Sequence, residues 1–183
     1  TFHLKDLWTY RELLYFLTWR DVKVRYKQTA VGVIWAILQP VMTTAIFTVI
    51  FSTVARFDSK AIPYPLFALS GFLVWLFVFN SITFAANSLI SNTNLVTKIY
   101  FPRMIVPISA TLAALFDLVL SVFVLAILMG FYVAQGDVAL SPSILAAPFF
   151  IMLAAVLTVA LGTMFAALNV RYRDVKFALP FGL

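Results

Sequence analysis

The sequence predicts an all-α polytopic membrane protein, in which an amphipathic interface helix near the N-terminus precedes four transmembrane helices. Hydrophobic residues make up 63% of the 183 residues and charged residues only 11%, whereas a soluble domain has about 25% charged residues. Four apolar runs each exceed the ~20 helical residues that cross a bilayer, and none alternates as membrane strands do. This composition argues against a soluble enzyme and excludes a disordered chain.

The first expected element is a helix over residues 9–29. Residues 10–27 contain no Gly or Pro, and on a helical wheel an aromatic-rich group separates from a basic group. The aromatic-rich group is Tyr15, Trp19, Val22 and Tyr26. The basic group is Arg20, Lys23 and Lys27. Aromatic rings beside cations suit a helix in the headgroup layer, and a second apolar face (Leu13, Leu17 and Val24) predicts that one face contacts lipid and the other protein.

The four apolar runs cover residues 33–55, 66–90, 105–133 and 144–169. Gln39-Pro40 interrupts the first, and proline removes a backbone hydrogen bond and bends a helix. Nearby Thr and Ser residues make this helix the best candidate to face a polar path, although such residues also occur at ordinary helix contacts. Turns are expected at 56–65 and 134–142. Residues 177–183 have the pattern of a further spanning helix that begins there, and we expect residues 1–183 to form one domain.

The connection at 91–104 is expected to contain a short helix, capped by Asn92 or Asn94 and ended before Pro102. Three large side chains follow one another at its end, at positions 99 to 101. Exposed rings in a polar segment need a cover, so we favour docking into the groove of a partner protein over contact with lipid.

Lys and Arg are distributed unequally between the two expected sides. Eleven lie before the first run, within 91–104 or after the fourth run, and only two lie in the other connections. Because cations favour the cytoplasmic side, both ends of the chain are predicted to be cytoplasmic. The net charge of +6 is interpreted as orientation and contact with membrane lipid, and nucleic acid is not expected as a partner.

Asp117 is the only charged residue in the four runs. An intramembrane carboxylate is costly and favours a functional role. The alternative is a hydrogen-bonded carboxylate at a helix contact, with Asn80 or Asn87 as its partner. No Lys, Arg or His lies within the runs to form a proton relay with it.

Several kinds of functional residue are missing from the sequence. It contains no Cys, its one His is His3, and no phosphate-binding GxxxxGK[ST] loop occurs. We therefore expect no enzymatic activity, no metal and no cofactor on this chain.

Three stretches together resemble one family. Residues 20–29 (RDVKVRYKQT), followed by Gly32, Trp35 and Leu38-Gln39-Pro40, are similar to the N-terminal region of ABC-2 type polysaccharide-export permeases. Residues 94–103 (NLVTKIYFPR) resemble the coupling-helix segment of that family, and 169–175 (NVRYRDV) resemble the Arg-Asp motif after its fourth helix.

The resemblance implies a homodimer of six-helix permeases in the bacterial cytoplasmic (inner) membrane, with this chain accounting for four of the six helices. It also implies two ATP-binding cassette subunits, which hold ATP and Mg²⁺. The implied substrate is undecaprenyl-pyrophosphate-linked polysaccharide of the O-antigen class, with teichoic acid or capsule as the alternative. A competing interpretation from a different class is an ion-coupled secondary transporter or channel that uses Asp117.

Four groups of candidate site residues follow. The residues expected at the lipid or substrate headgroup are Arg20, Lys23, Arg25, Tyr26 and Lys27. The residues expected to line the channel are Trp35, Gln39, Pro40, Thr43, Thr44 and Phe47. The residues expected to couple to the ATPase are Asn94, Lys98, Ile99, Tyr100, Phe101 and Arg103. The second cytoplasmic motif consists of Arg171, Arg173 and Asp174.

Overall fold

The computed structural model describes residues 8–27, 33–53, 62–138, 141–172 and 174–182. Within these ranges every regular element is a helix, as predicted. The helices are α2 (Arg11–Lys27), α3 (Val33–Thr53), α4 (Tyr64–Ser91), α5 (Thr93–Lys98), α6 (Ile105–Gln135), the short 3₁₀ helix η1 (Pro142–Ala146), α7 (Ala147–Arg171) and α8 (Val175–Gly182). The predicted turn at 56–65 lies outside the described residues except at its end.

Three of the four predicted spans have the length and hydropathy to cross a membrane over described residues: Tyr64–Ser91, Ile105–Gln135 and Pro142–Arg171. The first run is also helical, with Pro40 inside the helix. Its described apolar part, Ile37–Phe51, is shorter than the three candidate spans. The end of α6 is set by Gly136, whose φ of 84° is left-handed. The next amide, that of Asp137, donates to the carbonyl of Tyr132 at 3.1 Å, which is the usual glycine termination of a helix.

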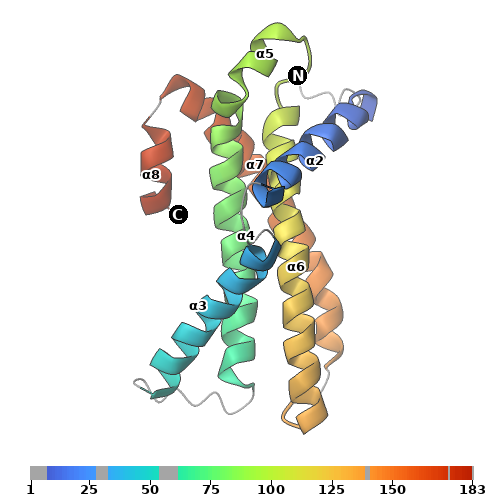
Figure 1. The fold of residues 1–183 in the computed structure, drawn as a ribbon, viewed down its shortest axis with the longest axis vertical. Helices are drawn as coiled ribbons and strands as arrows, with labels where there is room; N and C mark the ends of the chain where they lie inside the picture. The colour runs from blue at the N-terminus through green and yellow to red at the C-terminus, as the bar shows by residue number, and fades with distance from the viewer. Residues whose placement is uncertain (1–7, 28–32, 54–61, 139–140, 173, 183) are drawn as a thin grey trace.

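Helix α4 is at the centre of the bundle, because it packs against both α6 and α7. In Figure 1 these three helices run along the long axis, while α5 and the junction between α7 and α8 lie at one end. Helix α2 slopes from that end toward the middle of the bundle, where α3 begins and continues toward the opposite end (Figure 1). The two segments that we expected on one side of the membrane, α5 and the region where α7 is followed by α8, therefore lie at the same end of the bundle.

Helix α2 is packed against α6 rather than lying apart from the bundle. Its Leu17 is buried with Phe101, Ile105 and Val106, and Val22 is buried as well. The two predicted apolar faces were only partly right in composition. Tyr15 and Trp19, which we grouped with Val22, are exposed, and so is Val24, which we grouped with Leu17.

Candidate functional site

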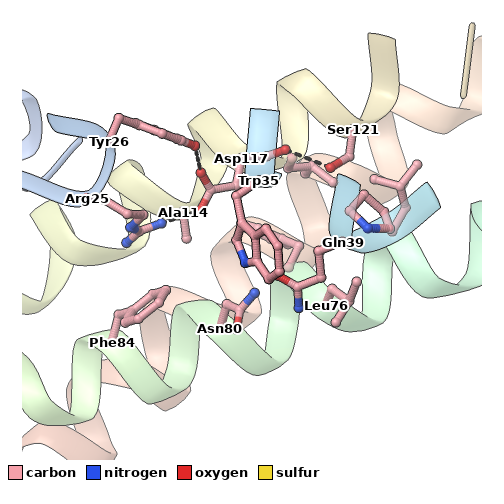
Figure 2. Close-up of a pocket in the computed structure, with 14 residues that line it drawn as sticks. Arg25, Tyr26, Trp35, Gln39, Leu76, Asn80, Phe84, Ala114, Asp117 and Ser121 are labelled. Atoms are coloured by element: carbon pink, nitrogen blue, oxygen red, sulfur yellow. Dashed lines mark hydrogen bonds and ion pairs between the residues drawn. The ribbon is translucent and has the colours of Figure 1, made fainter. Parts of the chain in front are cut away.

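Asp117 joins the end of α2 to the middle of α6. The Nη1 of Arg25 donates to one carboxylate oxygen in an ion pair, and the Tyr26 hydroxyl donates to the other. Figure 2 shows both side chains directed at Asp117, with the Ser121 hydroxyl donating to the backbone carbonyl of Asp117 at 2.9 Å. Asp117 lies about 18 Å along the helix axis from Ile105, at 1.5 Å per residue. The polar cluster is therefore deep within the length of a spanning helix.

Aromatic rings hold the two donors in place. The guanidinium carbon of Arg25 lies 4.1 Å from the ring centre of Phe84 on α4, and the Tyr26 ring meets Phe116 edge to face at 5.7 Å. Burial first, and then the hydrogen bond to Asp117, raise the pKa of Tyr26 above the ordinary tyrosine value. The hydroxyl therefore stays protonated at neutral pH and acts as a donor.

The expected partners of Asp117 were wrong. The structure pairs it with Arg25 and Tyr26, and no hydrogen bond joins it to Asn80 or Asn87 among the described residues. A guanidinium neutralises the carboxylate, which an amide cannot do. The four apolar runs contain no Lys, Arg or His. The cation comes instead from α2, which slopes toward the middle of the bundle and brings Arg25 to Asp117. The lone carboxylate in the sequence could have indicated an ion pair, because a buried charge requires a counter-charge from some neighbouring element.

A cavity of about 250 Å³ opens beside this cluster. It brings Arg25 and Tyr26, predicted for the headgroup, together with three residues predicted for the channel (Figure 2). These three are Trp35, Gln39 and Pro40. From α4 the lining includes Asn80 and Phe84, and from α6 it includes Asp117 and Ser121. The cavity wall thus combines an ion pair, amides, a hydroxyl and aromatic rings.

The other three predicted channel residues do not line this cavity. Thr43 donates to the carbonyl of Gln39 at 2.9 Å, which satisfies it within its own helix. Thr44 is buried, and its hydroxyl has no hydrogen-bond partner among the described residues. The Phe47 ring lies 4.8 Å from that of Phe72 on α4, so it contacts α4 while remaining exposed.

The predicted headgroup cations separate into two kinds. Arg20 forms an ion pair with Asp21 at 2.7 Å, and the same nitrogen donates to Oδ1 of Asn92 at 2.8 Å, so it ties α2 to the start of α5. Lys23 and Lys27 are exposed, and no ion pair joins either to another described residue. Lys23 lies 5.6 Å from the ring centre of Trp19. These two lysines remain available to an anionic partner.

The coupling segment presents two of the three expected large side chains. Tyr100 is 97% exposed and Ile99 is 56% exposed, but Phe101 is only 7% exposed. The expectation for Phe101 was therefore wrong, because it packs on Leu17 of α2. Asn94, Lys98 and Arg103 are exposed. Asn92 stands at the N-cap of α5, but its side chain makes no capping bond.

A larger cavity of about 1520 Å³ lies between the coupling segment and the α7–α8 region. Its lining includes Thr93, Thr97 and Arg103 on one side and Val170 and Lys176 on the other. The coupling segment and residues of α7 and α8 therefore line one hollow. Arg171 and Asp174 are exposed beside it without lining it, and Arg173 lies outside the described residues. We refer to this hollow as the α5 groove.

In the described part of the chain, no three His, Asp or Glu side chains gather closely enough to hold a metal ion. The hydroxyls, amides and single carboxylate of the two cavities can bind polar or anionic groups, but they form no nucleophile–base pair for covalent chemistry.

Residues 12–183 match the family of ABC-2 type transporters. An O-antigen export system permease protein RfbA of Myxococcus xanthus is 29% identical over 174 residues, which covers 94% of this chain and 64% of that protein. Two proteins of the same name from Klebsiella pneumoniae are 26% and 27% identical over 176 and 173 residues, with the same coverage. The chain thus spans 64% of the length of these curated relatives.

Proposed function

Because the chain belongs to the ABC-2 type transporter family, we propose that it is the permease subunit of an exporter for undecaprenyl-pyrophosphate-linked polysaccharide of the O-antigen class. The names of its relatives from Myxococcus xanthus and Klebsiella pneumoniae support this substrate class. The structural observation that carries the proposal is the cavity at Asp117, where a guanidinium and aromatic rings lie inside the length of spanning helices.

Substrate capture begins at the exposed side of α2. Lys23 and Lys27 are exposed there, and each basic residue near an anionic membrane surface contributes about 1 kcal/mol. The pyrophosphate then reaches Arg25 at the cavity, and the glycan follows a path along Trp35 and Gln39. An aromatic face suits a sugar ring because it offers apolar area without fixing the register of the chain.

The free energy comes from a separate ATPase subunit that binds ATP and Mg²⁺, and the permease itself hydrolyses nothing. We place the docking site of this subunit at the α5 groove, because Thr97 and Arg103 line it and the exposed Ile99 and Tyr100 lie between these two residues in the sequence. Two permease chains form the exporter in the bacterial inner membrane. The N-terminus, α5 and the α7–α8 junction then face the cytoplasm, in agreement with the distribution of Lys and Arg.

An ion-coupled transporter built on Asp117 finds less support. Its carboxylate has a fixed counter-charge in Arg25 and a hydrogen bond from Tyr26, so its charge is balanced within the protein without a bound ion.

The docking proposal is tested by comparing Tyr100→Ser with Phe101→Ser in the full-length permease, purified with its ATPase. Tyr100→Ser should lower ATP-driven export of lipid-linked O-antigen in proteoliposomes without lowering the melting temperature of the permease, because the ring is almost fully exposed. Phe101→Ser should lower the melting temperature, since it removes a buried ring and such losses cost about 3–5 kcal/mol.

Tyr132→Ser is the matched control, since it makes the same chemical change near the opposite end of α6 and should leave export unchanged. Full export by Tyr100→Ser would place the ATPase elsewhere. Transport that persists without the ATPase and follows an ion gradient would refute the exporter itself.

A further inference from the structure

We propose that Asp117 is an internal competitor for the anionic headgroup of the substrate. In the ion pair seen here it holds the guanidinium of Arg25, and the pyrophosphate displaces it from that guanidinium when it enters the cavity. Asp117 is thus a positioning residue that sets the affinity and the anion selectivity of the site. This inference rests on the proposed function, because it concerns the same cavity.

The ion pair is placed where an incoming anion can reach it. Both Arg25 and Asp117 line the cavity, and each side chain keeps 25% of its surface exposed. An ion pair sealed inside a helix contact would serve stability alone. A pair on a cavity wall offers its guanidinium to whatever enters the cavity.

The guanidinium has donors to offer. Arginine carries five N–H groups in one plane, and Arg25 uses Nη1 for Asp117. The ring of Phe84 lies against the guanidinium at 4.1 Å, and stacking of this kind leaves the in-plane donors for a planar or tetrahedral anion. Arginine can bind phosphate oxygens in a bidentate manner, whereas Asp117 accepts from Arg25 through one oxygen only, so a pyrophosphate can engage more of these donors than Asp117 does.

The displaced carboxylate is not left without partners. The Tyr26 hydroxyl donates to the Asp117 oxygen that does not bind Arg25, and this bond can persist when Arg25 turns to the substrate. Asn80 also lines the cavity and carries amide donors. The exchange therefore replaces one anion with another at Arg25, while Tyr26 limits the cost of leaving a carboxylate in a low-dielectric site.

The exchange also changes the attachment of α2. Arg20 ties the middle of α2 to Asn92, and about 7.5 Å further along the helix axis Arg25 ties its last turn to Asp117. When the substrate takes Arg25, the second tie is released while the first remains. Because Arg20 still joins α2 to Asn92 at the start of α5, a movement of α2 that follows this release can be passed on to α5.

The test measures binding of undecaprenyl pyrophosphate, without glycan, to the full-length permease with its ATPase in nanodiscs of zwitterionic lipid. Asp117→Asn keeps the shape and removes the competing charge, so it should bind this lipid about tenfold more tightly than the unmodified protein. Tyr26→Phe removes the donor that supports the displaced carboxylate, so it should bind about fivefold more weakly. A purely structural role would not move the two variants in opposite directions.

Asp137→Asn is the matched control, because Asp137 is exposed beyond the far end of α6 and should leave the affinity unchanged. Melting temperatures of all variants are measured alongside. If Asp117→Asn does not fold, Tyr26→Phe alone tests the exchange. Weaker binding by this variant supports the exchange, and unchanged or tighter binding overturns it.

The possible failures are distinguishable. If the unmodified protein binds undecaprenyl pyrophosphate and Asp117→Asn binds it no more tightly, the exchange is wrong and the proposed function stands. If the unmodified protein binds it no better than phosphatidylglycerol presented in the same nanodiscs, the proposed substrate class is wrong and the inference falls with it.

Discussion

Gly162 fixes how closely α7 approaches α4. A Cβ atom added at Gly162 would lie 2.7 Å from the Cβ of Ala85 and 3.7 Å from the Thr111 hydroxyl. Carbon atoms in contact are normally about 3.5–4.0 Å apart, so the two helices would have to separate by roughly 1 Å. Ala85 is fully buried and has no rotatable side chain with which to make room. The backbone itself must therefore move.

Gly162→Ala should destabilise the protein by about 1–3 kcal/mol, which is the usual cost of overpacking a core. The matched control is Gly71→Ala, because a Cβ at Gly71 meets nothing within 4 Å. In a helix interior, replacing Gly by Ala is favourable by up to about 1 kcal/mol. The two substitutions are identical in chemistry and should have opposite effects on stability. The free energy of unfolding of the full-length permease in detergent measures both.

A second variant tests the named contact directly. Adding Ala85→Gly to Gly162→Ala removes the atom that the new methyl group would meet, so the double variant should recover most of the lost stability. Neighbouring residues in contact are expected to be non-additive in this way. If Gly162→Ala is as stable as Gly71→Ala, or if Ala85→Gly gives no recovery, then close approach of α4 and α7 does not control the stability of this bundle.

Two other substitutions test separate parts of the molecule. Asn169 is fully buried, and its Nδ2 donates to the carbonyl of Ala86 at 2.9 Å. Asn169→Leu should therefore lower the free energy of unfolding by about 1–2 kcal/mol in the same assay. Unchanged stability would show that this hydrogen bond between α7 and α4 does not stabilise the bundle. Lys23→Glu combined with Lys27→Glu should lower export in proteoliposomes while the complex with the ATPase still assembles, because an exposed attractive pair becomes repulsive. Export at the unmodified rate would remove both lysines from substrate capture.

Hydropathy alone predicts most of this fold, because a spanning helix must satisfy every backbone polar group within itself. The runs that begin near residues 66, 105 and 144 are long helices with the composition of spans. The helix ends follow local chemistry that is also readable, as at Gly136. What hydropathy cannot give is the tilt of a helix that lies beside the spans. The slope of α2 depends on its packing against α6, which no local pattern encodes.

Phe101 illustrates the same limit at the level of one side chain. It stands beside Pro102 in a polar connection, and from the sequence it is indistinguishable from Tyr100. The structure buries the first and exposes the second, because Leu17, which is 84 positions earlier in the chain, covers one of them. Contacts between segments that are distant in the sequence decide which of two neighbouring aromatic residues is buried. The sequence could therefore predict exposed large side chains in this segment, but not which of them are exposed.

The cations of α2 carry a signal that sequence reasoning did not use. In α2, Arg20 and Arg25 form ion pairs within the protein, whereas Lys23, Lys27 and also Arg11 are exposed and form no ion pair with another described residue. From position 20 onward this division follows from the side chains, because a guanidinium is planar, weakly hydrated and suited to fixed pairing, whereas an ammonium is a strongly hydrated point charge. Between the neighbouring cations at positions 23 to 27, Arg25 is therefore the better candidate for the intramembrane carboxylate, and Lys23 and Lys27 are the candidates for the membrane surface.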